Sequence, residues 1–284
     1  MIIRFLGTGT SVGVPQIGCN CHVCRSHDSR DKRRRCGLYV QAGAEAFLVD
    51  TPPELRTACL EYGISHVDAV VLTHAHMDHL AGFDDVRRFN TINGRMEPCD
   101  PHAPGANGRT FRLIGKPLRC YALPETIAQV HRIFPYIGTQ PSQIGLYRPQ
   151  VEFHPNTESF TIGTAHLTAF PVEHGFPCCG YLIESNGVRF AYASDCNGLS
   201  PETIEFLKDV DVLVIDCLRE REHVTHFNKD RALQAISRIA PRQAYITHMC
   251  HDLTHVEWEA TLPQGVSPAY DGLVLTLGEE EQKE

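Results

Sequence analysis

Residues 73–79 read Thr-His-Ala-His-Met-Asp-His, so four side chains that can bind a metal fall within six residues. The apolar, β-branched run Val67–Leu72 before this motif predicts a buried strand, and Leu80–Phe89 after it predicts a helix. Binding sites of α/β proteins form at the carboxyl ends of strands. The motif therefore lies where an active site is expected, rather than in an ordinary polar turn.

The directions of the side chains divide this motif into two halves. In an extended segment alternate side chains point the same way, so His74 and His76 can share one metal ion. Where the chain turns into the helix, Asp78 and His79 point elsewhere and can serve a second ion. Neutral imidazole suits Zn, Mn or Fe, and carboxylate favours harder ions, so the identity of the metals stays open.

Three later side chains also follow apolar, strand-like segments: His174, Asp195 and His248. A single His or Asp in such a place is most often a turn residue. Their recurrence after three separate strands indicates that they complete one site, since a zinc hydrolase needs more ligands than the first motif supplies.

This order of residues resembles the metallo-β-lactamase fold, over residues 1–277. The resemblance implies an α/β protein, an αββα sandwich of two mixed sheets flanked by helices. It also implies a dinuclear site in which three residues hold one ion, three hold the other, and one bridges them. These are His74, His76 and His174 for the first ion, Asp78, His79 and His248 for the second, and Asp195 for the bridge.

Two acids refine the resemblance. Asp50 matches an acid of the family that orients the ligand loop, although it also reads as an ordinary helix-initiating Asp before Thr51-Pro52. An Asp at position 195, where antibiotic-degrading lactamases have Cys, is more similar to phosphodiesterases and related hydrolases.

A second metal site is indicated by Cys19, Cys21 and Cys24. Three thiolates need one more ligand to close a tetrahedral zinc site, and His251 is the best candidate, with Cys36 and His22 as alternatives. His251 lies three residues after His248, so one loop would serve both sites. We therefore expect two divalent metal ions at the catalytic site (Zn or Mn, with Fe also compatible) and one structural Zn.

The run GTGTSVGVPQIGCNCHVC at residues 7–24, together with THMCH at residues 247–251, is similar to the phosphoribosyl 1,2-cyclic phosphate phosphodiesterases of phosphonate degradation. The resemblance implies a metal-dependent hydrolase, a phosphodiesterase that attacks a small cyclic or linear phosphodiester with hydroxide held between two metals. Asp78, Asp195 and His226 would carry the catalysis. His226 matches a non-ligand histidine that acts as general acid or binds phosphate; the alternative is a solvent-facing residue at a helix start.

Three segments lie outside this pattern. Residues 93–117 are rich in Gly and Pro and are expected to form a long loop insertion that borders the site. The basic run at residues 30–35 is either a solvated face or a site that captures phosphate or RNA. Residues 279–284 are expected to be a disordered acidic tail, which leaves residues 1–278 as one domain.

Composition limits the remaining choices. The net charge of −8 argues against a broad nucleic-acid-binding surface, and no apolar run approaches the roughly 20 residues of a membrane span. The start of the chain does not resemble a signal peptide, and most of the 12 cysteines lie in apolar surroundings, so a cytoplasmic location is expected. The expected partner is a small phosphorylated substrate, with no membrane; a homodimer is compatible with the sequence.

Other functions remain open at this stage: a nuclease resembling ribonuclease Z, a lactone or thioester hydrolase, and a metal-binding accessory protein without catalysis. The complete set of ligands argues against the last of these, because a degenerate site would have lost at least one.

Overall fold

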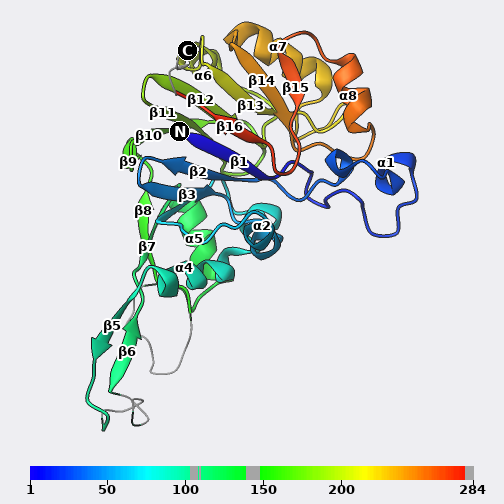
Figure 1. Ribbon diagram of the computed structural model, residues 1–284. Coiled ribbons are helices and arrows are strands. Elements are labelled where there is room, and N and C mark those ends of the chain that lie inside the picture. The colour runs from blue at the N-terminus through cyan, green and yellow to red at the C-terminus, as the bar shows by residue number, and fades with distance from the viewer. Residues whose placement is uncertain (103–107, 109, 139–147, 279–284) are drawn as a thin grey trace, which may run out of the picture.

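Two seven-stranded sheets pack face to face in the computed structural model, which describes residues 1–102, 108, 110–138 and 148–278 (Figure 1). The first sheet has the order β16 (Val274–Thr276), β1 (Ile2–Gly7), β2 (Gly37–Ala42), β3 (Glu45–Val49), β4 (Ala69–Val71), β7 (Leu118–Ala122) and β8 (Val151–Pro155). The second has the order β15 (Val266–Pro268), β14 (Gln243–Thr247), β13 (Val212–Asp216), β12 (Val188–Ala193), β11 (Cys179–Ser185), β10 (Ala165–Pro171) and β9 (Phe160–Ile162).

Both sheets are mixed. The strands β3, β4, β7 and β8 are parallel to one another, as are β12 to β15, whereas β1 to β3 and β9 to β12 are antiparallel. Every residue of β4 and β13 is buried, as their continuous apolar sequences predict for central parallel strands. Of the predicted ligands, His74, Asp195 and His248 follow the parallel strands β4, β12 and β14, and His174 follows the antiparallel strand β10.

Helices cover the outer faces of both sheets. The first sheet is covered by α2 (Leu55–Glu61), α3 (Met77–Leu80), α4 (Arg87–Ile92) and α5 (Pro124–Ile133), and the second by α6 (Pro201–Phe206), α7 (Lys229–Ile239) and α8 (His255–Thr261). Between the sheets lies a core that includes Phe5, Phe47, Tyr181 and Phe190, all fully buried. The predicted αββα sandwich is thus confirmed, and no helix among the described residues has the length and apolarity that crossing a bilayer requires.

The segment after the metal motif differs from the single helix predicted over Leu80–Phe89. It is divided into α3, a 3-10 turn at Phe83–Val86, and α4. The division falls at Gly82, whose N–H donates to the carbonyl of Thr51 and where a Cβ would lie only 2.2 Å from the carbonyl oxygen of Pro52. Close packing against the chain after β3 therefore interrupts the helix, which the apolar pattern alone does not show.

The segment 93–117, predicted to be a loop, contains an antiparallel hairpin of β5 (Arg95–Pro98) and β6 (Phe111–Ile114) that projects from the body (Figure 1). Its base is fixed by Asn90, whose side chain donates to the carbonyls of Lys116 and Gln150 at 2.8 and 2.9 Å. Lys116 and Gln150 precede β7 and β8, so the hairpin starts at the amino-terminal edge of the sheet, opposite the ligands. The expectation that this segment borders the site is therefore wrong for its base; residues 103–107 and 109, and the predicted tail 279–284, lie outside the described residues.

Candidate metal centre

The first three histidines meet at the carboxyl edge of the two sheets. His74 and His76 follow β4 of the first sheet, and His174 follows β10 of the second. Nε2 of His174 lies 3.2 Å from Nδ1 of His76, and the ring centres of His74 and His174 are 5.1 Å apart. Nδ1 of His174 lies 3.0 Å from the carbonyl oxygen of Thr225, which it can reach only as a donor, so Nε2 is left as the free lone pair.

The second group consists of Asp78, His79, Asp195 and His248, and their candidate ligand atoms lie within 4.8 Å of one another. Oδ2 of Asp78 is 3.3 Å from Nε2 of His79 and 3.6 Å from Nε2 of His248. Asp78 and His79 lie on α3 and join Asp195 and His248 in this second group, although the ring centres of His79 and His74 are only 4.3 Å apart.

Asp195, after β12, lies between the two groups. Its Oδ1 is 3.0 Å from Nε2 of His79, and its Oδ2 is 3.3 Å from Nε2 of His248 and 3.9 Å from Nε2 of His174. A carboxylate in this position can reach an ion on either side, which is the geometry that a bridging ligand needs.

Buried polar atoms test whether these residues fit metal ions. Nε2 of His74, His79 and His248 and Oδ1 of Asp195 are buried, and none makes a hydrogen bond within the part of the chain that the structure describes. Buried polar atoms in folded proteins almost always have partners. The donor set of imidazole and carboxylate therefore fits divalent metal ions, which would satisfy these atoms.

The electrostatics agree with a cation site. Burial alone would lower the pKa of His79 and His248, but Asp195 and Asp78 hold the pKa of His79 well above its usual range and raise the pKa of His248 to about 9. Burial would likewise raise the pKa of Asp195, yet His248 and His79 keep it well below its usual range. The carboxylates thus create a negative potential that attracts positive charge to this point.

Asp50 has the orienting position predicted from the sequence. Its Oδ2 lies 2.8 Å from Nδ1 of His79, and its two oxygens accept hydrogen bonds from the N–H and the hydroxyl of Thr73, each at 2.8 Å. Asp50 and His248 both have left-handed backbone, with φ of 64° and 59°. Non-glycine residues seldom adopt this conformation, and its concentration at the two loops that present His79 and His248 is typical of functional sites.

His226 lies beside the second group without belonging to either predicted ligand set. Its ring stacks on that of His248 at 4.5 Å between centres, its side chain is 12% exposed, and its Nδ1 is 2.6 Å from Oδ2 of Asp216. Asp216 is fully buried and also accepts a hydrogen bond from the N–H of Cys196. Asp216 ends a buried strand, much as Asp195 follows one, but no motif in the sequence marks it as a functional residue.

The structure brings together the four side chains of the predicted thiolate site. The Sγ atoms of Cys19, Cys21 and Cys24 lie 3.3, 3.4 and 3.4 Å from Nδ1 of His251. Bonds of about 2.0–2.3 Å to a tetrahedral zinc place neighbouring ligand atoms roughly 3.5 Å apart, so the spacing fits. Burial acts to raise the pKa of Cys21, but hydrogen bonds from the N–H of Cys24 and from its thiol and imidazole neighbours lower it to about 6.

Neither alternative fourth ligand belongs to this cluster. The Cys36 thiol contacts the carbonyl oxygen of Gly9 and the hydroxyl of Thr247, and Nε2 of His22 pairs with Glu257. His251 is the fourth member of the cluster in the structure.

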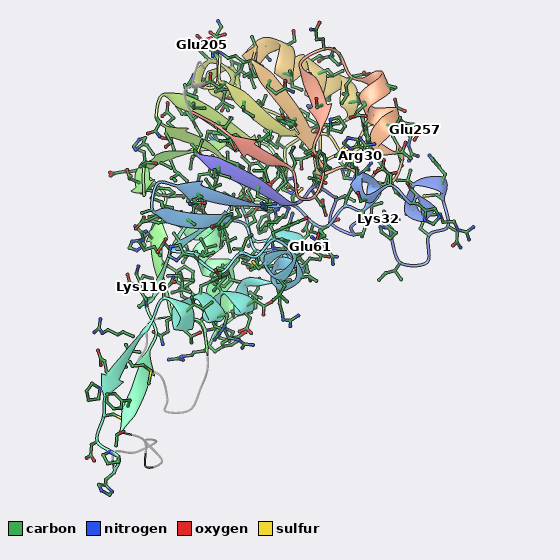
Figure 2. All side chains as sticks on the ribbon, viewed as in Figure 1. Arg30, Lys32, Glu61, Lys116, Glu205 and Glu257 are labelled. Atoms are coloured by element: carbon green, nitrogen blue, oxygen red, sulfur yellow. The ribbon has the colours of Figure 1, made fainter. Side chains whose placement is uncertain are left out.

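The basic run at residues 30–35 is mostly engaged in ion pairs rather than being a free cationic face. Arg30 lies on the side of the molecule near α8 (Figure 2) and pairs with Asp28 at 2.8 Å. Arg34 pairs with Glu61 at the end of α2, and Arg35 with Glu54. Arg33 is fully buried, so the prediction of a solvated face is wrong for this residue.

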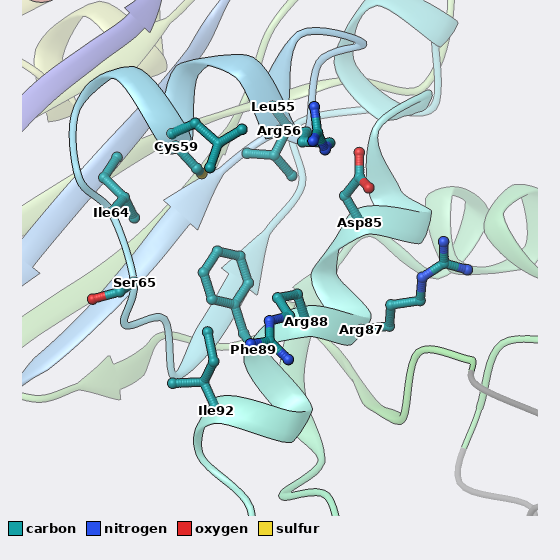
Figure 3. Close-up of a pocket in the computed structure, with 11 residues that line it drawn as sticks. Leu55, Arg56, Cys59, Ile64, Ser65, Asp85, Arg87, Arg88, Phe89 and Ile92 are labelled. Atoms are coloured by element: carbon teal, nitrogen blue, oxygen red, sulfur yellow. The ribbon is translucent and has the colours of Figure 1, made fainter.

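An apolar pocket of about 480 Å³ lies away from these sites, between α2 and α4 (Figure 3). Leu55, Cys59, Phe89 and Ile92 line it, and Arg56 and Arg88 lie at its rim. None of its lining residues is a candidate ligand, so this pocket is distinct from the metal centre.

Comparison with known proteins gives consistent matches. Residues 45–249 match the model of the beta-lactamase superfamily domain. A crystal structure of a diphosphatase from the PhnP family is 34% identical and covers 97% of each chain, with a TM-score of 0.81.

Two curated relatives match more of the chain than the domain model does. An octanoyltransferase of Porphyromonas gingivalis is 33% identical over 280 residues, which are 96% of this chain but 51% of that protein. A coenzyme PQQ synthesis protein B of Methylobacterium nodulans is 26% identical over 232 residues, covering 74% of this chain and 71% of the relative. This chain thus spans about half the length of the first relative.

Proposed function

Because this chain belongs to the beta-lactamase superfamily and is a metallo-hydrolase, we propose that its metal centre hydrolyses a small phosphodiester, cyclic or linear. The observation that carries the proposal is the position of Asp195, within 4 Å of ligand atoms on both sides. Such an arrangement suits two ions set a few ångströms apart, which is the spacing that phosphoryl-transfer sites use.

The residues have defined tasks in this proposal. His74, His76 and His174 would hold one ion, Asp78, His79 and His248 would hold the other, and Asp195 would contact both. A bound pair of divalent ions supplies an activated water at neutral pH and neutralises phosphoryl oxygens as charge develops. Asp50 and Thr225 fix the imidazoles of His79 and His174 through Nδ1, so that Nε2 of each ring faces the centre.

His226 and Asp216 would handle the proton of the leaving group. Burial lowers the pKa of His226 to about 4 and raises that of Asp216 well above its usual range, and both shifts favour a proton on Oδ2 of Asp216, which lies 2.6 Å from Nδ1 of His226. With that proton on Asp216, the imidazole bears its hydrogen on Nε2. Transfer of this hydrogen to a departing oxygen would be matched by movement of the Asp216 proton onto Nδ1, so no isolated charge remains on the ring.

A diphosphate linkage is the second candidate substrate. The observation in its favour is the similarity over nearly the whole chain to a diphosphatase, at 34% identity. In both reactions water attacks phosphorus on the side opposite the departing oxygen, and the same residues would serve both. They differ in the leaving group, which is a sugar or alkyl oxygen in one case and a phosphate in the other.

The name of the octanoyltransferase relative does not by itself assign acyl transfer to this chain, because that protein is about twice as long as the matched part. A nuclease is also less favoured, since Arg30, Arg34 and Arg35 are paired with acids and the net charge is −8. Lactone or thioester hydrolysis and a non-catalytic role remain as outcomes of the test.

The test combines metal analysis with a substrate panel on one preparation. Mass spectrometry gives the metals per chain, and turnover is measured with bis-p-nitrophenyl phosphate, a ribose cyclic phosphate, a nucleoside diphosphate, a lactone, a thioester and a short RNA. Hydrolysis of the first two at rates well above the others supports the proposal. Preference for the diphosphate favours the second candidate, and a loaded protein that turns over none of the six would contradict hydrolysis of these classes.

A further inference from the structure

One buried arginine connects the two candidate metal sites. Arg33 is fully buried, and its Nη1 and Nη2 donate to the carbonyl oxygens of Cys250 at 2.5 Å and Leu253 at 2.9 Å. These carbonyls stand on either side of His251, the imidazole of the thiolate site. The planar fork of a guanidinium holds two such acceptors at a fixed separation, which a lysine cannot do.

Asp31 extends this contact to the start of α8. Its Oδ1 accepts a hydrogen bond from the N–H of His255 at 2.6 Å and lies 3.4 Å from Nη2 of Arg33. The pair therefore fixes the chain at residues 250, 253 and 255, although 217 or more positions separate Arg33 from these residues.

The other side of Arg33 faces the segment that carries the cysteines. The backbone of Arg33 exchanges two hydrogen bonds of 2.8 Å with Val14, five residues before Cys19. Val14 packs with Val23 and Cys24 in a small apolar cluster under the three thiols. Arg33 is thus bonded to both segments that build the thiolate site.

The same loop presents a ligand of the other site. His248 precedes Cys250 by two residues and has left-handed backbone, so surrounding contacts must hold its conformation. Met249 exchanges backbone hydrogen bonds with Thr8 and Thr10, and the N–H of Cys250 donates to Leu218. The Arg33 contact with the carbonyl of Cys250 completes this set.

We propose that Arg33 is a positioning residue that couples the two metal sites. Through the carbonyls of Cys250 and Leu253 it makes the geometry of His251 and that of His248 depend on each other, so filling the thiolate site tightens metal binding by His248. By thermodynamic linkage the effect is reciprocal. The inference rests on the metal assignments of the proposed function but not on its substrate.

The test follows metal affinity without any substrate. The holo-protein is exchanged with Co²⁺ and titrated with a chelator. Thiolate-to-cobalt charge-transfer absorption reports the thiolate site, and total cobalt by mass spectrometry gives the remaining sites by difference. The variants are Arg33→Met, Arg33→Lys and Cys21→Ser, with Arg30→Met as matched control because Arg30 belongs to the same run but pairs only at the surface.

Arg33→Met should weaken cobalt binding at both sites by about 10–100-fold, the usual effect of removing a group that supports metal ligands. Arg33→Lys should weaken cobalt binding less than Arg33→Met does, because the ammonium group keeps the charge and can donate to one of the two carbonyls. Arg30→Met should stay within about twofold of wild type. Cys21→Ser should abolish the charge-transfer band and weaken the remaining sites by roughly fivefold or more.

The combined variant Arg33→Met/Cys21→Ser separates coupling from general damage. If Arg33 carries the coupling, Cys21→Ser causes no further loosening of the histidine–aspartate site once Arg33 is gone. The proposal would be overturned if Cys21→Ser weakened cobalt binding at the histidine–aspartate site equally with Arg33 and with Met at position 33. It would also be overturned if Arg33→Met left the cobalt affinity of that site unchanged. If circular dichroism shows that Arg33→Met does not fold, the same double-mutant cycle is run with Arg33→Lys. The proposal then requires that Cys21→Ser weaken cobalt binding at the histidine–aspartate site less in Arg33→Lys than in the wild-type protein.

A wild-type protein without the charge-transfer band would also overturn the coupling, because there would be no thiolate site to couple. That result leaves the hydrolase proposal to be judged by turnover alone, so the two can fail separately.

Discussion

Nδ1 of His226 lies 2.6 Å from Oδ2 of Asp216, and both side chains sit against the second group of candidate ligands. The contact fixes the plane of the imidazole and commits Nδ1 to the carboxyl, which leaves Nε2 as the nitrogen that can meet a substrate. A ring held in this way can exchange a proton with a leaving group without also serving as a metal ligand.

Removing His226 should affect poor leaving groups more than good ones. A sugar alkoxide needs a proton to depart, whereas p-nitrophenolate leaves almost unaided. His226→Ala should therefore cost about 10²–10⁴-fold in kcat on a cyclic sugar phosphate, and much less on bis-p-nitrophenyl phosphate. Both rates are measured on protein whose metal content has been verified.

Two other outcomes for His226→Ala would change its role. Equal losses on both substrates would indicate that the imidazole binds phosphate instead of protonating the leaving group. Loss of a metal would make His226 a ligand and place the role of His248 in doubt.

Asp216→Asn should weaken catalysis while keeping the metals. The amide preserves the shape of the side chain but cannot carry the shared proton. We expect a loss of about 10–100-fold on the cyclic substrate, with the same dependence on leaving group as His226→Ala. In the double variant His226→Ala/Asp216→Asn, the loss of activity should be smaller than the product of the two single losses. A loss equal to that product would show that the two residues act independently.

Asp195→Ala should abolish hydrolysis and leave the fold intact. The carboxylate lies between the two ligand groups, within 4 Å of Nε2 of His79, His174 and His248. Activity should fall by at least about 10³-fold, consistent with the several kcal/mol that metal ions contribute at such sites. Circular dichroism monitors folding, and retention of a tenth or more of the wild-type rate would exclude a bridging role.

Cys21→Ser should remove one metal per chain, lowering the content from about three to about two at saturating metal, since the thiolate site has its own four ligands. Binding of a structural zinc contributes folding free energy, so Tm should fall by roughly 2–4 °C for each kcal/mol lost. Elemental analysis and calorimetry test both statements. Three metals in the variant would show that these cysteines do not form a metal site.

Replacing residues 95–114 with a short Gly-Ser linker should leave hydrolysis nearly unchanged. Arg95 and Ile114 are paired at the base of the hairpin, and Gly94 and Gly115 lie against each other, so the ends can be joined. The base lies at the sheet edge opposite the ligands. We expect kcat/KM on bis-p-nitrophenyl phosphate within about threefold of wild type, as for a change remote from the transition state. A larger loss of kcat/KM would contradict this prediction and show that the hairpin contributes to the substrate site.

The ligands could be predicted from the sequence because each stands at the end of an apolar strand, and strand ends converge at one edge of a sheet. Asp216 likewise stands at the end of an apolar strand, Val212–Asp216, but no adjacent histidine or repeated motif marks it as part of the site. Helix α8 begins at a capping box formed by Thr254 and Glu257, but it has too few apolar residues for a helical period to be visible in the sequence. The burial of Arg33 could not be predicted, since its partners are backbone carbonyls whose positions depend on the complete fold.

The ligands come from both layers of the sandwich: His74, His76, Asp78 and His79 from the first sheet, and His174, Asp195 and His248 from the second. The centre is therefore sensitive to how the two sheets are aligned. Phe190 is fully buried between the sheets, so the cavity left by Phe190→Ala would weaken the packing of one layer on the other, and metal affinity should fall together with stability. Interior packing that touches neither substrate nor metal therefore also contributes to the geometry of the centre.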